Sequence, residues 1–203
     1  MAKLLTFVEK SNPILRETMN PITNFKDKNL QETLSDMRFS IHPKQLKAAN
    51  GAHDNAAGMA ANQWGIRLRA FIYSPYGSES PKNLKVMLNP SYKPHLRENE
   101  TEPKITAAYE GCFSVPLTTG AVHRYDAIVA TYYTPDGEKQ EEILEGWEAR
   151  VFQHETDHLD GKLFDGALDN FKGPVCQNRI IFKDKEEMAA FWDKMSADNT
   201  DEK

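Results

Sequence analysis

The segment that most constrains the fold of this chain is residues 153–158, which read Gln-His-Glu-Thr-Asp-His. On an α-helix, His154 and His158 lie one turn apart on the same face, so both imidazoles can reach one metal ion. Glu155 lies about 100° around the helix from His154, so its carboxylate can address a water molecule beside that ion. The pattern predicts a helix over residues 148–159, closed by Gly161. A solvated helix whose two histidines share a face by chance is the simpler alternative.

Two histidines leave a catalytic metal site incomplete, because such a site uses three protein ligands and keeps one position open. No histidine follows His158 in the chain. The downstream acids that could serve as a third ligand are Asp160, Asp165 and Asp169. Upstream, Cys112 offers a thiolate, which is a strong ligand for zinc or ferrous iron. A small buried cysteine without any such role is equally compatible with the residues around it, so the third ligand stays open at this point.

Composition limits the class of protein. The chain has 203 residues and a formal net charge of −5, which favours one compact domain and argues against binding nucleic acid through the overall field. No apolar run approaches the roughly 18 residues of a membrane helix, and no export signal is visible, so we expect a cytoplasmic protein. The two cysteines, Cys112 and Cys176, are too few for a disulfide scaffold.

The first half of the chain combines helical periodicity with loops. Apolar residues at three- and four-residue intervals predict an amphipathic helix that ends before Pro43. These residues are Leu30, Leu34, Met37 and Ile41. Residues 48–57 are small and polar and are expected to form a loop, and residues 92–106 a long surface connection.

Strands dominate the middle of the chain, and helices follow late. We expect strands over residues 69–74, 84–88 and 127–133, the last paired through a hairpin with residues 140–144. A final helix is expected over residues 185–195. This order indicates an α+β domain rather than alternating βαβ units. We divide the chain into one catalytic domain, residues 1–183, and a C-terminal helix with a polar tail, residues 184–203.

Two further segments join the histidine pattern. Residues 58–63 read Gly-Met-Ala-Ala-Asn-Gln, and residues 110–114 read Glu-Gly-Cys-Phe-Ser. In this order, the three segments resemble the three motifs of peptide deformylases, which are Gly-x-Gly-[Leu/Ile]-Ala-Ala-x-Gln, Glu-Gly-Cys-Leu-Ser and Gln-His-Glu-x-Asp-His. The likeness spans roughly residues 5–170. Ala56 replaces the first glycine, Phe113 replaces the common leucine, and the segment of residues 41–55 is expanded.

The resemblance implies antiparallel or mixed sheets packed around a central helix that carries the histidine motif. It also implies a hydrolase that removes the N-formyl group from the N-terminal methionine of newly synthesised polypeptides and releases formate. Cys112, His154 and His158 would bind one divalent ion, ferrous iron in the cell, for which Zn²⁺, Ni²⁺ or Co²⁺ can substitute. Glu155 would act as general base and then acid.

The same resemblance predicts which residues contact the substrate. The side-chain amide of Gln63 and the backbone N–H of Phe113 would donate to the oxyanion. The peptide would lie beside Gly58 and Ala57 as an added strand. Residues expected to line the methionine slot are Val151, Trp147 and Ala108. Arg124 and Arg150 are expected to form ordinary surface pairs rather than to support Asp157.

Two alternatives remain at this stage. A zinc peptidase of the His-Glu-x-x-His type would need a third ligand other than Cys112. A non-catalytic, metal-stabilised protein that binds N-terminal peptides would have no use for Glu155 or Gln63. Formate release from a formylated methionyl peptide separates catalysis from binding.

The C-terminal segment is acidic. Residues 183–203 contain four lysines and seven acidic residues, a net charge of −3, which ribosomal RNA would repel. Apolar residues at helical spacing are expected to pack this helix on the domain. These residues are Met188, Phe191, Trp192 and Met195. Any ribosome association is therefore expected to involve another surface, and neither membrane binding nor direct nucleic-acid binding is expected.

Overall fold

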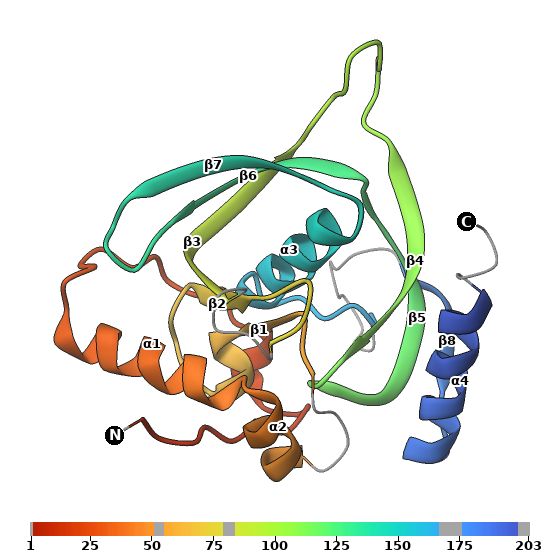
Figure 1. Ribbon diagram of the computed structural model, residues 1–203, viewed down its shortest axis with the longest axis horizontal. Helices are drawn as coiled ribbons and strands as arrows, with labels where there is room; N and C mark the ends of the chain where they lie inside the picture. Colours follow the sequence, from red (N-terminus) through yellow and green to blue (C-terminus); the bar gives the residue numbers. More distant parts are fainter. Residues whose placement is uncertain (1, 51–54, 79–83, 167–175, 199–203) are drawn as a thin grey trace.

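The computed structural model describes residues 2–50, 55–78, 84–166 and 176–198. Two sheets surround helix α3 (Gly146–Leu159), which contacts strands of both (Figure 1). The other helical elements are η1 (Pro13–Arg16), α1 (Lys28–Ser40), α2 (Pro43–Asn50), η2 (Ala61–Trp64) and α4 (Lys185–Asp198). The strands are β1 (Gly58–Ala60), β2 (Ala70–Tyr73), β3 (Lys85–Pro94), β4 (Ile105–Cys112), β5 (Val115–Tyr125), β6 (Ala127–Tyr133), β7 (Lys139–Glu145) and β8 (Cys176–Ile181).

Every strand pair in the two sheets is antiparallel. The five-stranded sheet has the order β1-β2-β3-β6-β7, and the three-stranded sheet has the order β4-β5-β8. The predicted α+β class is therefore confirmed. Strand β1 and strand β4 are edge strands, so each leaves one side of its backbone free of a strand partner within the described sheets.

Helix α3 is the centre of the core. The ring of Phe152 packs edge-on against Phe71, Tyr73 and Tyr92 from β2 and β3, with ring centroids 5.3–6.5 Å apart. The helix begins two residues before its predicted start. Past its end, Gly161 has a φ of +71° and lies so close to Arg16 that an added Cβ would be 2.5 Å from the Arg16 carbonyl oxygen. Glycine is therefore required where the chain leaves the helix.

Two local predictions were wrong. Residues 48–50 belong to α2 rather than to a loop, while residues 51–54 of that predicted loop lie outside the described part of the chain. Proline suits the first turn of a helix, so Pro43 begins α2 as well as ending α1, and Leu46 anchors α2 in the core. The surface connection is also shorter than predicted, because β3 continues to Pro94 and β4 starts at Ile105.

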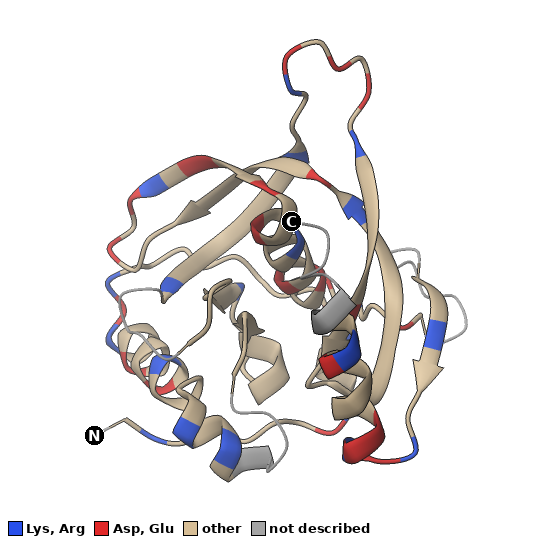
Figure 2. Ribbon diagram, turned by 45° about the vertical axis from the view of Figure 1, so that its right-hand side comes forward, with Lys and Arg blue, Asp and Glu red and all other residues tan. Residues whose placement is uncertain are grey.

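Charged residues are frequent on the connection between β3 and β4 and on α4, whereas the central strands contain few (Figure 2). None of the helices in the described ranges is both long and apolar enough to cross a membrane.

Helix α4 packs on the three-stranded sheet. The ring of Phe191 lies 5.3 Å from Tyr109 of β4 and 5.4 Å from Phe182, which links β8 to α4. Met188 is buried. The predicted packing of the apolar face on the domain is confirmed for these residues.

Removing residues 185–203 is expected to lower the melting temperature by about 5–10 °C. The deletion takes away a buried Met188 and the aromatic contacts of Phe191, together worth about 2–4 kcal/mol, in a protein where 1 kcal/mol shifts Tm by roughly 2–4 °C. Thermal unfolding followed by circular dichroism measures the shift. Removal of residues 197–203 alone serves as the control and is expected to leave activity unchanged. An unchanged Tm in the longer deletion would show that α4 adds nothing to stability.

Candidate active site

Cys112, His154 and His158 converge on one point at the end of β4. One ligand atom from each of these residues lies within 4.8 Å of the others, and Cys112 Sγ is 3.2 Å from His158 Nε2. Metal–ligand bonds of about 2.0–2.3 Å place neighbouring ligands of a tetrahedral ion about 3.5 Å apart, so these atoms fit around one ion with small adjustments. The register of β4 on β5 shifts between Gly111 and Cys112, an irregularity of the kind that re-aims side chains beside active sites.

The downstream acids are not part of this cluster. Asp160 pairs with Arg69 at 2.8 Å, and Asp165 pairs with Lys10 at 2.6 Å. Asp169 lies outside the described residues. Of the candidate third ligands that the structure describes, Cys112 alone groups with the two histidines.

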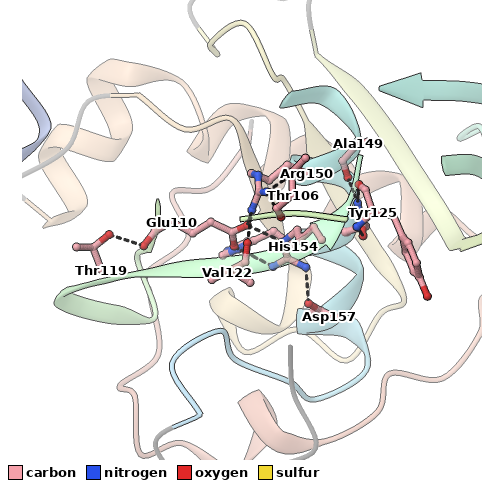
Figure 3. A network of polar contacts seen from close by, with 11 residues as sticks. Thr106, Glu110, Thr119, Val122, Tyr125, Ala149, Arg150, His154 and Asp157 are labelled. Atoms are coloured by element: carbon pink, nitrogen blue, oxygen red, sulfur yellow. Dashed lines mark hydrogen bonds and ion pairs between the residues drawn. The ribbon is translucent and has the colours of Figure 1, made fainter. Parts of the chain in front are cut away.

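Glu110 holds His154 in place. His154 Nδ1 lies 2.8 Å from Glu110 Oε2, which leaves Nε2 as the nitrogen available to an ion (Figure 3). Burial would raise the pKa of Glu110, but the charge of Arg124 and its hydrogen bonds outweigh burial and hold the pKa well below its usual range. Glu110 therefore stays a carboxylate and accepts the N–H of the imidazole.

The two histidines differ in their readiness to bind a metal ion. Burial lowers the pKa of His158 well below its usual value, so its imidazole is neutral, the form that ligates metals. Burial would also lower the pKa of His154, but hydrogen bonds to Cys112 and Glu110 raise it. A proton and a metal ion therefore compete for His154 in the metal-free chain.

The expected surface pairing of Arg124 and Arg150 was wrong. Arg124 donates to Glu110 at 2.6 Å and to Asp157 at 2.8 Å, and its side chain is 3% exposed. Arg150 donates to Glu110 at 2.8 Å and to the carbonyl oxygen of Val122 at 2.9 Å (Figure 3). A guanidinium has five donors in a planar fork, so one Arg124 can join two buried carboxylates.

Glu155 is buried beside the three candidate ligands, and its Oε2 has no hydrogen-bond partner in the described structure. Burial is the main cause that raises the pKa of Glu155 to about 7. A carboxyl group with this pKa can take up and release a proton near neutral pH, which suits a general acid–base group.

Gly58 gives Glu155 its space. A Cβ at position 58 would lie 2.6 Å from Glu155 Cγ and 2.7 Å from Oε1, closer than real Cβ atoms approach. The segment of residues 58–63 therefore needs glycine at position 58 because of Glu155, a tertiary contact that the residue pattern does not reveal.

Gly58→Ala is expected to lower kcat/KM for a formylated methionyl peptide, the substrate that the sequence resemblance implies, by about 10²-fold, because displacing a catalytic group by about 1 Å costs on that order. Metal content should not change, since the three atoms nearest to an added Cβ all belong to Glu155, which is not one of the candidate ligands. Steady-state kinetics and elemental analysis measure the two quantities. A loss below threefold would show that Glu155 moves aside without cost.

Gln63 points its amide nitrogen at the cluster. Its Oε1 accepts the backbone N–H of Ala60 at 2.9 Å. Its Nε2 donates to Ser114 Oγ at 3.1 Å and lies 3.6 Å from Cys112 Sγ. The acceptor end is thus held by β1, and the donor end faces the site. Ser114 was not singled out from the sequence, although it belongs to the second motif.

Phe113 and Asn62 also make contacts next to the candidate site. The Phe113 ring stacks on Phe7 with the ring centroids 5.2 Å apart, and both rings pack against the buried core that includes Met59 and Trp64. Asn62 Nδ2 donates to the carbonyl oxygen of His158 at 2.6 Å and secures the end of α3. No sequence signal marks Asn62 for this role, apart from its place beside Gln63.

A cavity of about 530 Å³ opens onto the cluster. The predicted site residues that line it are Ala57, Gly58, Gln63, Cys112, Phe113, Trp147, Val151, His154 and Glu155. Ala108 is exposed on β4 and is not among the lining residues, so this cavity gives it no part in a methionine slot. Three residues of α4 also line the cavity, namely Lys185, Met188 and Trp192.

Comparison with known proteins points to one family. Residues 4–173 match the family model described as polypeptide deformylase. A peptide deformylase of Thermotoga petrophila is 34% identical over 170 residues, which cover 84% of this chain and 90% of the relative. The crystal structure of the Thermotoga maritima peptide deformylase matches with a TM-score of 0.62 and 32% identity, covering 79% of this chain and 95% of that one.

A third comparison includes a peptide. The Met-Ala-Ser-bound crystal structure of a class I type b peptide deformylase from Acinetobacter baumannii matches with a TM-score of 0.63 and 29% identity. The match covers 81% of this chain and 98% of that one.

Proposed function

The chain belongs to the polypeptide deformylase family, enzymes that remove the formyl group from the N-terminal methionine of new polypeptides, and we propose that it works through Cys112, His154, His158 and Glu155. One observation carries this assignment of residues. Glu155, whose buried Oε2 has no hydrogen-bond partner in the described structure, lines the same cavity as Cys112 and His154, which together with His158 could hold one ion. The cavity is large enough for a peptide end.

The family depends on a metal, and the Cys112, His154 and His158 group could hold one ion. When bound, the ion supplies Lewis acidity, which makes a water molecule acidic near neutral pH. Glu155 would accept a proton from the attacking water and pass it to the departing amine of methionine, so that the water oxygen bonds to the formyl carbon while the carbon–nitrogen bond breaks. Gln63 donates from Nε2, and Phe113 from its backbone N–H, to the negative charge that develops on the formyl oxygen.

We propose ferrous iron as the ion in the cell, with Zn²⁺, Ni²⁺ or Co²⁺ able to replace it. A thiolate and two imidazoles suit all of these metals, so the donor set supports a transition metal over Ca²⁺ or Mg²⁺, which prefer oxygen ligands.

The substrate peptide is proposed to enter along the edge strand β1. Ala57 and Gly58 line the cavity there, and small side chains let a second backbone approach. The methionine side chain is proposed to lie against Val151 and Trp147, which line the same cavity. That a related enzyme has been crystallised with Met-Ala-Ser supports a site that holds several residues of the chain.

The partner that follows from the function is a formylated nascent peptide. We propose that the enzyme meets it in the cytoplasm, where new chains leave the ribosome. The acidic C-terminal segment, with its net charge of −3, is not proposed as a ribosome contact.

Incubation of the purified chain with formyl-Met-Ala-Ser tests the function. We expect formate and free Met-Ala-Ser in equal amounts. Cleavage between methionine and alanine would favour the peptidase alternative, and binding without either product would favour a non-catalytic peptide-binding protein.

A further inference from the structure

Helix α4 lies beyond the segment that matches the family model, yet it lines the same cavity as the metal cluster. The matched segment ends at residue 173, and α4 covers Lys185–Asp198. The three α4 residues that line the cavity are Lys185, Met188 and Trp192. They are three and four positions apart, which places them on one face of the helix. This face therefore adds a wall that the family model does not include.

This wall of α4 residues lies close to the candidate metal ligand Cys112. Gly111 directly precedes the candidate ligand Cys112, and Trp192 Cζ2 lies 3.4 Å from the position of a Cβ on Gly111. Phe191 fixes the helix on Tyr109 at 5.3 Å, and β8, which leads into α4, pairs with β5. Gly111 and Tyr109 lie two residues apart on β4, so both contact α4 from one face of the strand.

The distances indicate which part of a substrate this wall would meet. Consecutive Cα atoms are about 3.8 Å apart, so the Trp192 ring lies within roughly 9 Å of the Cys112 Cα. Trp192 and Cys112 line the same cavity. An extended peptide advances about 3.3–3.6 Å per residue, so the part of a bound peptide that lies roughly 9 Å from the cluster in this cavity is its second and third residues. The cavity lining contains further apolar residues, because Pro116 and Leu117 line the same cavity as Met188 and Trp192.

We propose that Trp192 and Met188 form a specificity wall that favours large apolar side chains at the second and third residues of the formylated peptide. This inference rests on the proposed function. Trp192 touches the peptide away from the reacting atoms, so it sets substrate preference rather than the chemical step. The C-terminal segment thereby acts in substrate selection as well as in stability.

The test compares three substrates in the full-length, metal-loaded enzyme: formyl-methionine amide, formyl-Met-Ala-Ser and formyl-Met-Leu-Phe. The unmodified enzyme is expected to prefer formyl-Met-Leu-Phe over formyl-Met-Ala-Ser in kcat/KM. Trp192→Ala should reduce this preference about tenfold, the effect of losing a modest apolar contact, mainly through KM. Turnover of formyl-methionine amide should stay within twofold. Lys194→Ala, an exposed change on the same helix, is the matched control and should leave all three values unchanged.

Each other outcome has a definite meaning. An equal loss of kcat/KM on all three substrates would show that Trp192 only supports the fold. An unchanged preference between the substrates would contradict the proposed specificity wall. If Trp192→Ala does not fold, Trp192→Leu replaces it, and the unmodified enzyme must still show the preference. Turnover without any preference would overturn this inference alone. No turnover of any substrate would overturn the proposed function together with it.

Discussion

Glu155→Gln is expected to lower kcat for formyl-Met-Ala-Ser by about 10²–10⁴-fold or more while the metal content stays the same. Glutamine has nearly the same shape as glutamate, but it cannot accept a proton. The buried position of Glu155 and its pKa of about 7 make it the group best suited to move that proton. Steady-state kinetics and elemental analysis of the same preparation measure the two quantities.

Glu141→Gln is the control for this change, because Glu141 is an exposed carboxylate on β7 and does not line the cavity. It should behave like the unmodified enzyme. Near-normal activity of Glu155→Gln would mean that another residue transfers the proton, and the assignment of Glu155 would fail.

His154→Ala, His158→Ala and Cys112→Ala are each expected to lose the metal ion and to reduce activity to the background rate. Three protein ligands fit one ion, and the removal of any one leaves two, which is fewer than catalytic metal sites use. Elemental analysis should find about one ion per chain in the unmodified protein and much less in each variant. Chelation should remove activity from the unmodified enzyme, and added Fe²⁺ or Ni²⁺ should restore it.

Cys176→Ala is the matched control, because Cys176 is the other free cysteine and is not part of the metal-ligand group. It should keep both the ion and the activity. Full metal occupancy in Cys112→Ala would instead favour a third ligand elsewhere, as in the peptidase alternative. Full occupancy in either histidine variant would contradict the site itself.

Local periodicity made helix α3 and the β6–β7 hairpin predictable from the residues alone. His154 and His158 share a face because four residues make about one helical turn, whatever surrounds the helix. Strand β6 has the predicted bounds of residues 127–133, and its partner β7 includes the predicted residues 140–144. Resemblance to known motifs, rather than spacing, singled out Cys112 as a ligand and Gln63 as a donor.

Other features depended on contacts between residues far apart in the chain. The sequence determined that His154 and His158 share one helix face. Only the pairing of β4 with β5 and the packing of α3 bring Cys112 close to these two histidines. The same tertiary structure leaves Asp160 and Asp165 in other ion pairs. Tertiary structure likewise buries Arg124 between Glu110 and Asp157. The residue pattern alone had predicted an ion pair of Arg124 on the surface. Helical and hairpin patterns are encoded within a few residues, whereas burial and ligand choice depend on which distant segments the sheets bring together. For the same reason, the sequence predicted that α4 packs on the domain but not that its Trp192 lines the active-site cavity.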